Sequence, residues 1–193
     1  ADTFRALYPN VSYDPYGIYS TYTDSGGRLW FGTSSLGICL FDGTIIRWLY
    51  KDHLTNTPGG GSFGIRAMIE DRDGHFWFCN TRERFTIPPQ PADGDRVQYT
   101  TGAGVEAKGD ANVPYFFSIA EDKDGDLWMA CGEDGVYRKH GDALVHYPIT
   151  SNDERVRTFS VYVDHAGTLW VGTLGSGVYR YTGSDFERFV PAG

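Results

Sequence analysis

Aromatic and arginine side chains stand at two fixed distances before four tryptophans in this sequence of 193 residues. Counting back eleven or thirteen residues from each tryptophan gives Tyr19, Arg66, Tyr115, Phe117, Arg157 and Phe159. Aromatic rings can stack on the C–H faces of a sugar, and a guanidinium can donate charged hydrogen bonds to hydroxyls or acidic groups. These residue types therefore favour a carbohydrate-binding platform. The alternative is that about half of them pack between structural units.

Acidic turns and scattered histidines offer less specific chemistry. The acids in "DRDG" (71–74) and "DKDGD" (122–126) could chelate a hard cation such as Ca²⁺, yet the equivalent turns at 24–27 and 164–167 lack the second acid. The five histidines have no HxxxH or HxH spacing, and the three cysteines form no CxxC pair. The sequence therefore indicates no metal, no cofactor and no catalytic residue. The acids are predicted to cap turns, and the cysteines to be buried thiols.

A repeated pattern of Asp, Gly and Trp is the strongest signal in the chain. It occurs in "YTDSGGRLWFGT" (22–33), "IEDRDGHFWFCN" (69–80), "AEDKDGDLWMAC" (120–131) and "YVDHAGTLWVGT" (162–173). The matching residues are Asp24, Gly27 and Trp30; Asp71, Gly74 and Trp77; Asp122, Gly125 and Trp128; and Asp164, Gly167 and Trp170. Four matches at fixed offsets predict an architecture of structural repeats, with these twelve residues as its scaffold.

Each repeat predicts a small antiparallel sheet. An apolar, β-prone run precedes the Asp, a polar turn with a Gly follows, and a second strand begins at the aromatic residue, as in a hairpin. Third and fourth strands follow in most repeats and give a four-stranded meander of about 40–50 residues, the length of one propeller blade. We predict an all-β fold: a β-propeller of four four-stranded antiparallel blades that is part of a larger propeller. The four tryptophans are predicted to pack between blades and to contact no ligand.

The predicted blades cover residues 16–50, 63–100, 115–148 and 157–191 of a single propeller segment. The second blade departs from the pattern, because Arg84 replaces the Gly found seven residues after the other tryptophans. Its outer strand is expected within 95–100, followed by a loop at 101–114. The N-terminal "TFRALYP" (3–9) has the pattern of an outer strand, so 1–15 is expected to be the outer strand of a preceding blade plus a linker. This fifth outer strand implies further blades, unless the chain closes as a small ring or pairs with a second copy.

Charge and hydropathy argue against two classes of partner. The formal net charge is −8 and the 17 Lys and Arg residues are scattered, whereas proteins that bind nucleic acid carry a basic patch. No window approaches the roughly 18 apolar residues of a membrane helix, so membrane insertion is not expected. The chain starts at Ala1 without an apolar leader, which is typical of a mature or excised product. The expected partner is a small molecule, a glycan or a protein, besides the blades or second copy that would complete the ring.

The segments "EDKDGDLWMACGEDGVYRK" (121–139) and "VDHAGTLWVGTLGSGVYRYTGSDFERF" (163–189) resemble the two-component regulator propeller repeat. Such repeats form the periplasmic sensor propellers of bacterial hybrid histidine kinases, notably ones that detect carbohydrates. The resemblance implies a ligand-sensing or protein-interaction module in the periplasm or outside a bacterial cell, and it leaves enzymatic activity open. The repeat is also similar to that of streptogramin lyases. The alternative is therefore a lyase that acts on a cyclic peptide or a glycan.

Overall fold

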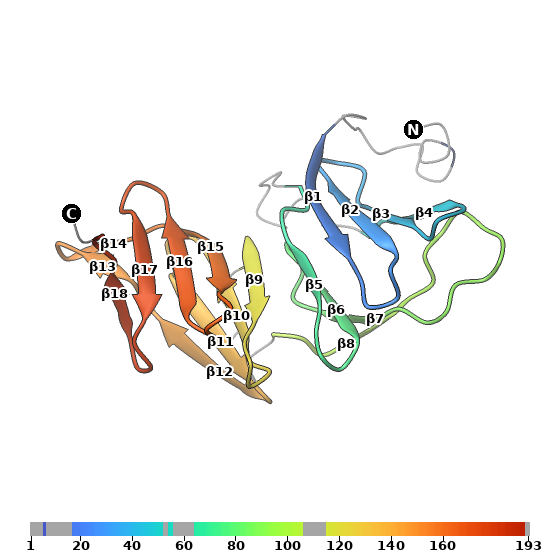
Figure 1. The fold of residues 1–193 in the computed structure, drawn as a ribbon. Coiled ribbons are helices and arrows are strands. Elements are labelled where there is room, and N and C mark those ends of the chain that lie inside the picture. Colours follow the sequence, from blue (N-terminus) through green and yellow to red (C-terminus); the bar gives the residue numbers. More distant parts are fainter. Residues whose placement is uncertain (1–5, 7–16, 52–53, 56–63, 106–114, 192–193) are drawn as a thin grey trace. The chain divides into compact units, whose positions relative to one another are not determined.

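The computed structural model describes residues 6, 17–51, 54–55, 64–105 and 115–191 of the chain (Figure 1). In this described part every element is a strand, and the strands form four four-stranded antiparallel sheets and one short hairpin. The predicted fold class, an all-β chain of four four-stranded antiparallel propeller blades, is confirmed. The outer strand expected at 1–15 lies outside the described residues except for Ala6, as does the predicted loop beyond Val105.

The chain divides into two compact units, Ala1–Gly104 and Val105–Gly193, each of which holds two blades. Blade 1 consists of β1 (Ile18–Thr23), β2 (Leu29–Thr33), β3 (Ile38–Phe41) and β4 (Ile46–Leu49); blade 2 consists of β5 (Met68–Glu70), β6 (His75–Phe78), β7 (Arg84–Thr86) and β8 (Thr100–Gly102). Blade 3 consists of β9 (Ser118–Glu121), β10 (Leu127–Ala130), β11 (Val136–His140) and β12 (Ala143–Tyr147); blade 4 consists of β15 (Thr158–Val163), β16 (Leu169–Thr173), β17 (Val178–Tyr181) and β18 (Phe186–Arg188). The hairpin of β13 (Thr150–Ser151) and β14 (Glu154–Arg155) connects blades 3 and 4.

A side-chain hydrogen bond between Asp and Trp recurs in all four hairpin turns. The indole Nε1 of each repeat tryptophan donates to the Oδ2 of the Asp six residues earlier, at 2.7 Å for Trp30 and Trp77 and at 2.8 Å for Trp128 and Trp170. The Oδ1 of the same Asp accepts two backbone N–H groups of its turn. The third residue after each Asp is the repeat glycine, which has a positive φ of 77–89° that only glycine adopts without strain. The carboxylate therefore fixes both the turn and the orientation of the indole.

The repeat tryptophan of one blade packs on the next blade within each unit. The Trp30 ring lies 4.8 Å from the ring of Phe76 on β6, and the Trp128 ring lies 4.8 Å from the ring of Tyr181 on β17, measured between centroids. Trp30, Trp77 and Trp128 are buried, whereas Trp170 is half-buried and makes an edge contact with Phe189 of its own blade. Burial of large aromatic rings between sheets is thus the main source of packing energy in both units.

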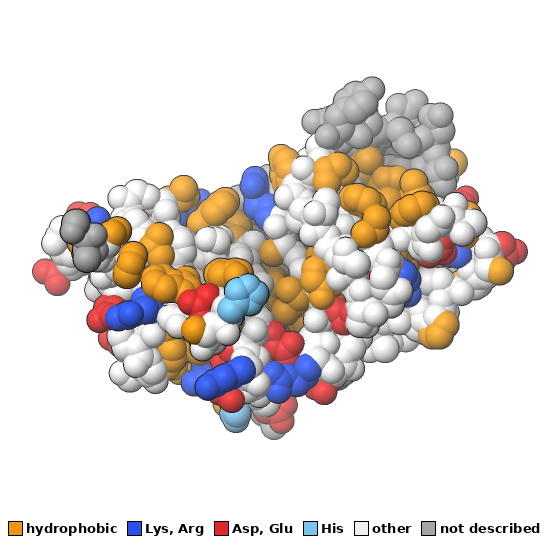
Figure 2. All heavy atoms as spheres, in the orientation of Figure 1, with side chains coloured by type: hydrophobic (Ala, Val, Ile, Leu, Met, Phe, Trp, Pro, Cys, Tyr) orange, Lys and Arg blue, Asp and Glu red, His pale blue; other side chains and the backbone are white. Residues whose placement is uncertain are grey.

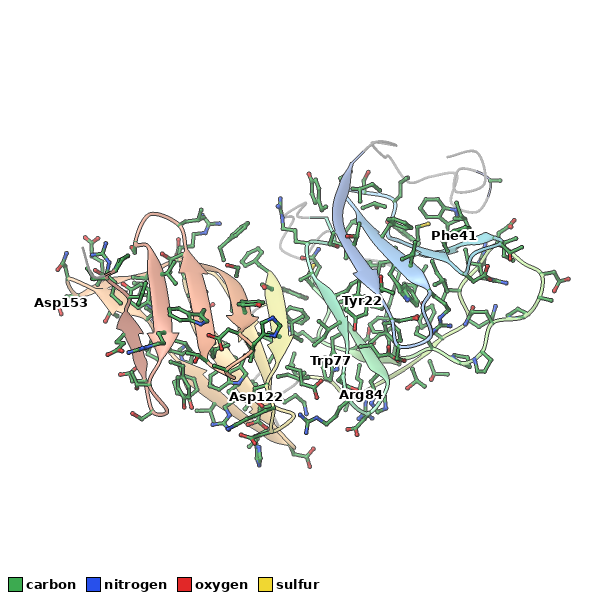
Figure 3. The ribbon with its side chains drawn as sticks, viewed as in Figure 1. Tyr22, Phe41, Trp77, Arg84, Asp122 and Asp153 are labelled. Atoms are coloured by element: carbon green, nitrogen blue, oxygen red, sulfur yellow. The ribbon has the colours of Figure 1, made fainter. Side chains whose placement is uncertain are left out.

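Polar contacts join neighbouring inner strands. Ser20 on β1 donates to the carbonyl of Ile65 (2.7 Å), and Ser118, the first residue of β9, accepts the N–H of Val161 on β15 (3.1 Å). Tyr22, labelled in Figure 3, accepts the N–H of Glu70 (3.1 Å). These side-chain bonds hold the inner strands of adjacent blades in a fixed register.

The outer strand of blade 2 begins only at the last of residues 95–100, within which it was expected. β8 starts at Thr100, and 95–97 instead lies parallel to β4 of blade 1: the N–H of Trp48 donates to Asp95 O (2.8 Å) and the N–H of Val97 donates to Trp48 O (3.0 Å). The connection before it carries three prolines, which cannot donate to a ladder. The buried Arg47 holds this connection by donating to Pro91 O (2.5 Å) while it pairs with Asp42.

We expect Trp128→Ala to lower the free energy of unfolding by about 3–5 kcal/mol, because a fully packed aromatic ring leaves a cavity. The matched control is Trp170→Ala, which should cost only about 1–2 kcal/mol because its ring is half-buried. Urea denaturation of both variants and the parent measures the difference. Equal losses in the two variants would contradict packing between blades 3 and 4 as the role of Trp128.

The Asp164 turn predicts a pH dependence. The pKa of the Asp164 carboxyl lies below its usual 3.8, because the Trp170 indole and the Thr168 amide donate hydrogen bonds to the charged form. A carboxyl with a lower pKa in the folded state stabilises the fold fully above its unfolded pKa, and this contribution disappears as the pH falls through the folded pKa. Unfolding should therefore become easier below about pH 4.

The variant Trp170→Phe removes the indole donor, so we expect it to move the Asp164 pKa back toward 3.8 and to weaken the acid dependence of unfolding. Carbon-detected NMR titration of the carboxyl, combined with urea denaturation at each pH, measures both quantities. An Asp164 pKa that does not change in Trp170→Phe would show that the indole bond is not its cause.

Candidate functional site

The six predicted ligand-binding residues lie at the start of the inner strands. Tyr19 is the second residue of β1, Arg66 comes shortly before β5, Tyr115 and Phe117 come just before β9, Arg157 comes directly before β15, and Phe159 lies within β15. Tyr19 and Arg66 belong to the first compact unit and the other four residues to the second. The residues of each unit are therefore described by themselves, as one cluster in each unit.

In the first unit, the residues eleven before Trp30 and Trp77 contact each other across two blades. The Arg66 guanidinium lies over the Tyr19 ring, with its Cζ 4.6 Å from the ring centroid, and both side chains are exposed. The ring rests against Gly64, where an added Cβ would come within 2.5 Å of Tyr19 Cδ2. Such a cation–π contact at the surface contributes about 0.5–1 kcal/mol and leaves the guanidinium N–H groups able to bind a ligand.

In the second unit, the equivalent residues are both phenylalanine and are stacked. The rings of Phe117 and Phe159 have centroids 6.3 Å apart and planes inclined by 19°. Phe159 is exposed, and Phe117 lies beside Gly132, where an added Cβ would come 3.1 Å from the ring. Thr158 donates its N–H and its hydroxyl to Gly132 O, both at 3.0 Å. This link between blades 3 and 4 holds the two rings in place.

Tyr115 and Arg157 stand two residues before these stacked rings in the sequence. Tyr115 is half-buried, whereas Arg157 is exposed and its carbonyl accepts the N–H of Leu174 (2.9 Å). The exposed guanidinium adds a cation two residues before Phe159 in the sequence. The second cluster thus combines an apolar ring surface with one positive charge.

The glycines under the rings, and the serines between inner strands, are features that sequence reasoning missed. Gly64 and Gly132 leave space for Tyr19 and Phe117. A serine follows the position eleven before the tryptophan in three blades, at Ser20, Ser118 and Ser160. This recurring serine is visible when the four repeats are compared, and it could have predicted the hydrogen bonds between blades.

The acidic turns have structural roles in the chain. Ligand atoms of Asp71, Asp73 and His75 lie within 4.8 Å of one another, but the Asp71 carboxylate already accepts two amides and the Trp77 indole. In blade 3 the buried Asp126 carboxylate pairs with Arg138 (Nε 2.6 Å) and His140 (Nδ1 2.6 Å). Burial raises the pKa of Asp126, but the hydrogen bonds from His140 and Arg138 outweigh this effect and lower it. The turns therefore favour capping and ion pairing over cation binding.

The three cysteines are buried thiols and form no disulfide. Burial raises the pKa of the Cys39 thiol to about 11 and also raises that of Cys79. A buried thiol that stays protonated at neutral pH is a poor nucleophile and a poor metal ligand.

Within the described residues there is no helix long and apolar enough to cross a membrane.

The sequence model of a family described as "Two component regulator propeller" matches residues 12–35, 110–133 and 150–175. These stretches contain the repeat motifs of blades 1, 3 and 4. The comparison with curated proteins found no match.

Two solved structures share the fold at low sequence identity. Virginiamycin B lyase from Staphylococcus aureus is 17% identical, with a TM-score of 0.62 over 93% of this chain and 57% of the lyase chain. PorZ, a surface component of the type-IX secretion system of Porphyromonas gingivalis, is 17% identical, with a TM-score of 0.54 over 84% of this chain and 25% of that chain. This chain thus spans just over half the length of the lyase.

Likeness at this identity concerns architecture and not activity. The family match is more specific, because it falls on the segments that carry the Asp, Gly and Trp pattern. The same pattern forms the hydrogen-bonded turn of every described blade. Three of the four repeats of the chain therefore match the model described as "Two component regulator propeller".

Proposed function

We propose that the chain is a ligand-sensing module of a bacterial signalling protein, that it lies outside the cytoplasm, and that it recognises carbohydrate. The family description supports the sensing role, because it names two-component regulators. The site chemistry supports the ligand class. Its ring surfaces and guanidinium groups suit a molecule with both apolar faces and polar edges.

Aromatic rings at one repeat position, two of them exposed and one half-buried, carry this proposal. The residue eleven before the tryptophan is aromatic in three of the four blades, as Tyr19, Phe117 and Phe159. One exposed aromatic residue is common on a soluble protein, but its recurrence at the same position in both units is not explained by packing alone. Pyranose rings present a face of C–H groups that stacks on such aromatic surfaces.

The arginines favour sugars that carry acidic or hydroxyl groups. The chain has a net charge of −8, yet Arg66 and Arg157 place exposed guanidinium groups in the two clusters. A guanidinium binds a carboxylate through two parallel hydrogen bonds that are strengthened by the opposite charges, and a neutral sugar offers no negative charge. We therefore expect oligosaccharides that contain uronic acids to bind more tightly than neutral ones.

The alternative activity, a lyase of the streptogramin type, would need a general base within hydrogen-bond reach of the substrate. The six candidate residues supply rings, phenols and guanidinium groups, but none of them is a carboxylate or an imidazole. The likeness to virginiamycin B lyase concerns the fold at 17% identity. Binding is therefore the better supported function of these residues.

A panel of immobilised neutral and uronic-acid-containing oligosaccharides, followed by calorimetric titration of the best binder, tests this function. We expect Phe159→Ala to weaken binding about tenfold, because a stacking contact of about 1–1.5 kcal/mol is lost. Arg66→Ala or Arg157→Ala should weaken binding of the acidic sugar selectively. All three variants should melt like the parent, because these side chains are exposed.

Tyr162→Ala is the matched control, because Tyr162 is an exposed aromatic residue on the same strand as Phe159 but outside the repeat position of the site. Its affinity for the oligosaccharide should equal that of the parent. The proposal fails if no oligosaccharide binds, or if Phe159→Ala and Tyr162→Ala have the same affinity.

A further inference from the structure

The outer edge of blade 1 carries an added segment of extended chain. Residues 95–97 lie parallel to β4, where the N–H of Trp48 donates to Asp95 O (2.8 Å) and the N–H of Val97 donates to Trp48 O (3.0 Å). This segment belongs to none of the four-stranded sheets, and Val97 is buried. A single extended segment is therefore sufficient to pair with the outer strand of a blade in this chain.

The outer strand of blade 3 offers the same backbone groups. Trp48 on β4 and His146 on β12 each pair with the residue nine positions after the repeat tryptophan of their blade. Along an antiparallel strand, residues that bond to the inner neighbour alternate with residues whose N–H and C=O point to the other side. His146 therefore directs its N–H and C=O outward as Trp48 does, and so does Leu144, two residues earlier.

In the described part of the chain, β12 has no strand on its outer side. The sheet of blade 3 ends at β12, and the two isolated bridges involve other residues. Val145, which stands between the two outward-facing residues, is 43% exposed. The outward N–H and C=O groups of β12 are thus those of a sheet edge, which can pair with another extended chain.

The strand β12 also lacks the features that protect the other outer strands. Sheet edges that must not pair are usually short, charged or interrupted by proline. The strands β8 and β18 have three residues each, and β18 contains Glu187 and Arg188. By contrast, β12 has five residues, Ala143–Tyr147, and none of them is Lys, Arg, Asp, Glu or Pro. Among the described outer strands, β12 is therefore the one best suited to accept a further strand.

We propose that β12 binds an extended peptide segment of a partner protein, which becomes a fifth strand of blade 3. The occupant is a lone segment because a lone segment, 95–97, fills the same position on β4. Main-chain hydrogen bonds to Leu144 and His146 hold the peptide, and one of its apolar side chains covers Val145. A second copy of this chain fits less well, because each copy carries a net charge of −8.

Charge does not select the peptide. Figure 2 shows acidic and basic side chains mixed over the visible surface, without a large area of one sign. Beside β12, Arg138 and His140 pair with Asp126, and Arg155 pairs with Asp134. Recognition through backbone groups and one apolar contact is therefore the mode that this edge supports.

A library of random peptides displayed on phage and selected on the full chain supplies the probe, which is a synthetic copy of the best binder. His146→Pro removes one outward N–H but no bond to β11, a position where an edge strand tolerates proline. His146→Ala is the matched control, because it removes the same exposed side chain and keeps the N–H. In calorimetric titration we expect His146→Pro to bind about tenfold more weakly than His146→Ala, which should bind like the parent. Circular dichroism checks that both variants are folded.

Amide hydrogen exchange of the parent chain, followed by NMR, locates the contact without any variant. The N–H groups of Leu144 and His146 should exchange quickly in the free chain and slowly with the peptide bound, whereas Val145 should be protected in both states by β11.

The proposal is overturned if no peptide is selected, if the two variants bind with equal affinity, or if the new protection lies away from β12. Light scattering provides a further test. A parent that is dimeric, with His146→Pro monomeric, also overturns the proposal, because a second copy would then occupy the edge.

Discussion

The hydrogen bonds of one carboxylate per blade determine how this chain folds. In each hairpin turn the Asp binds two backbone amides through one oxygen and the tryptophan indole through the other. Burial raises the pKa of Asp24, but the hydrogen bonds from Trp30 and Arg28 outweigh it and keep the carboxyl ionised. The turn, the position of the second strand and the direction of the indole are thereby set together. Without this bond the polar indole N–H would be buried between blades without a partner, at a cost of about 1–3 kcal/mol.

The position of the candidate site follows from the same constraint. Once the indole is fixed, the inner strand runs back from the turn, and the residue eleven before the tryptophan falls at the start of that strand. Neighbouring inner strands are held together by the bonds of Ser20 and Ser118 to the next blade. Residues at this position in adjacent blades therefore meet, as Arg66 meets Tyr19 and as Phe159 meets Phe117. The scaffold residues thus place the rings.

The repeat pattern predicted the blades and the capping role of the Asp, because both depend on local sequence. The bond from the indole to the Asp was not predicted, since it requires the register of a complete hairpin. The crossing of 95–97 to blade 1 was also missed, because prolines excluded a regular strand without indicating which edge the chain would join. The pattern placed Tyr19 and Arg66 at equivalent positions, but their contact depends on how two blades pack. Tertiary packing, and not local preference, decided each of these features.

A propeller blade cannot bury both of its faces alone, and the exposure of its residues is therefore a property of its neighbours. Val136 and Val178 have the same residue type and repeat position, but one is buried and the other is 41% exposed. Stability in such arrays is approximately the sum of the stability of each repeat and of each interface between neighbouring repeats. Trp170 is half-buried for the same reason, although its bond to Asp164 matches those of the other three tryptophans. The turn fixes the ring, and only an adjacent blade can bury it.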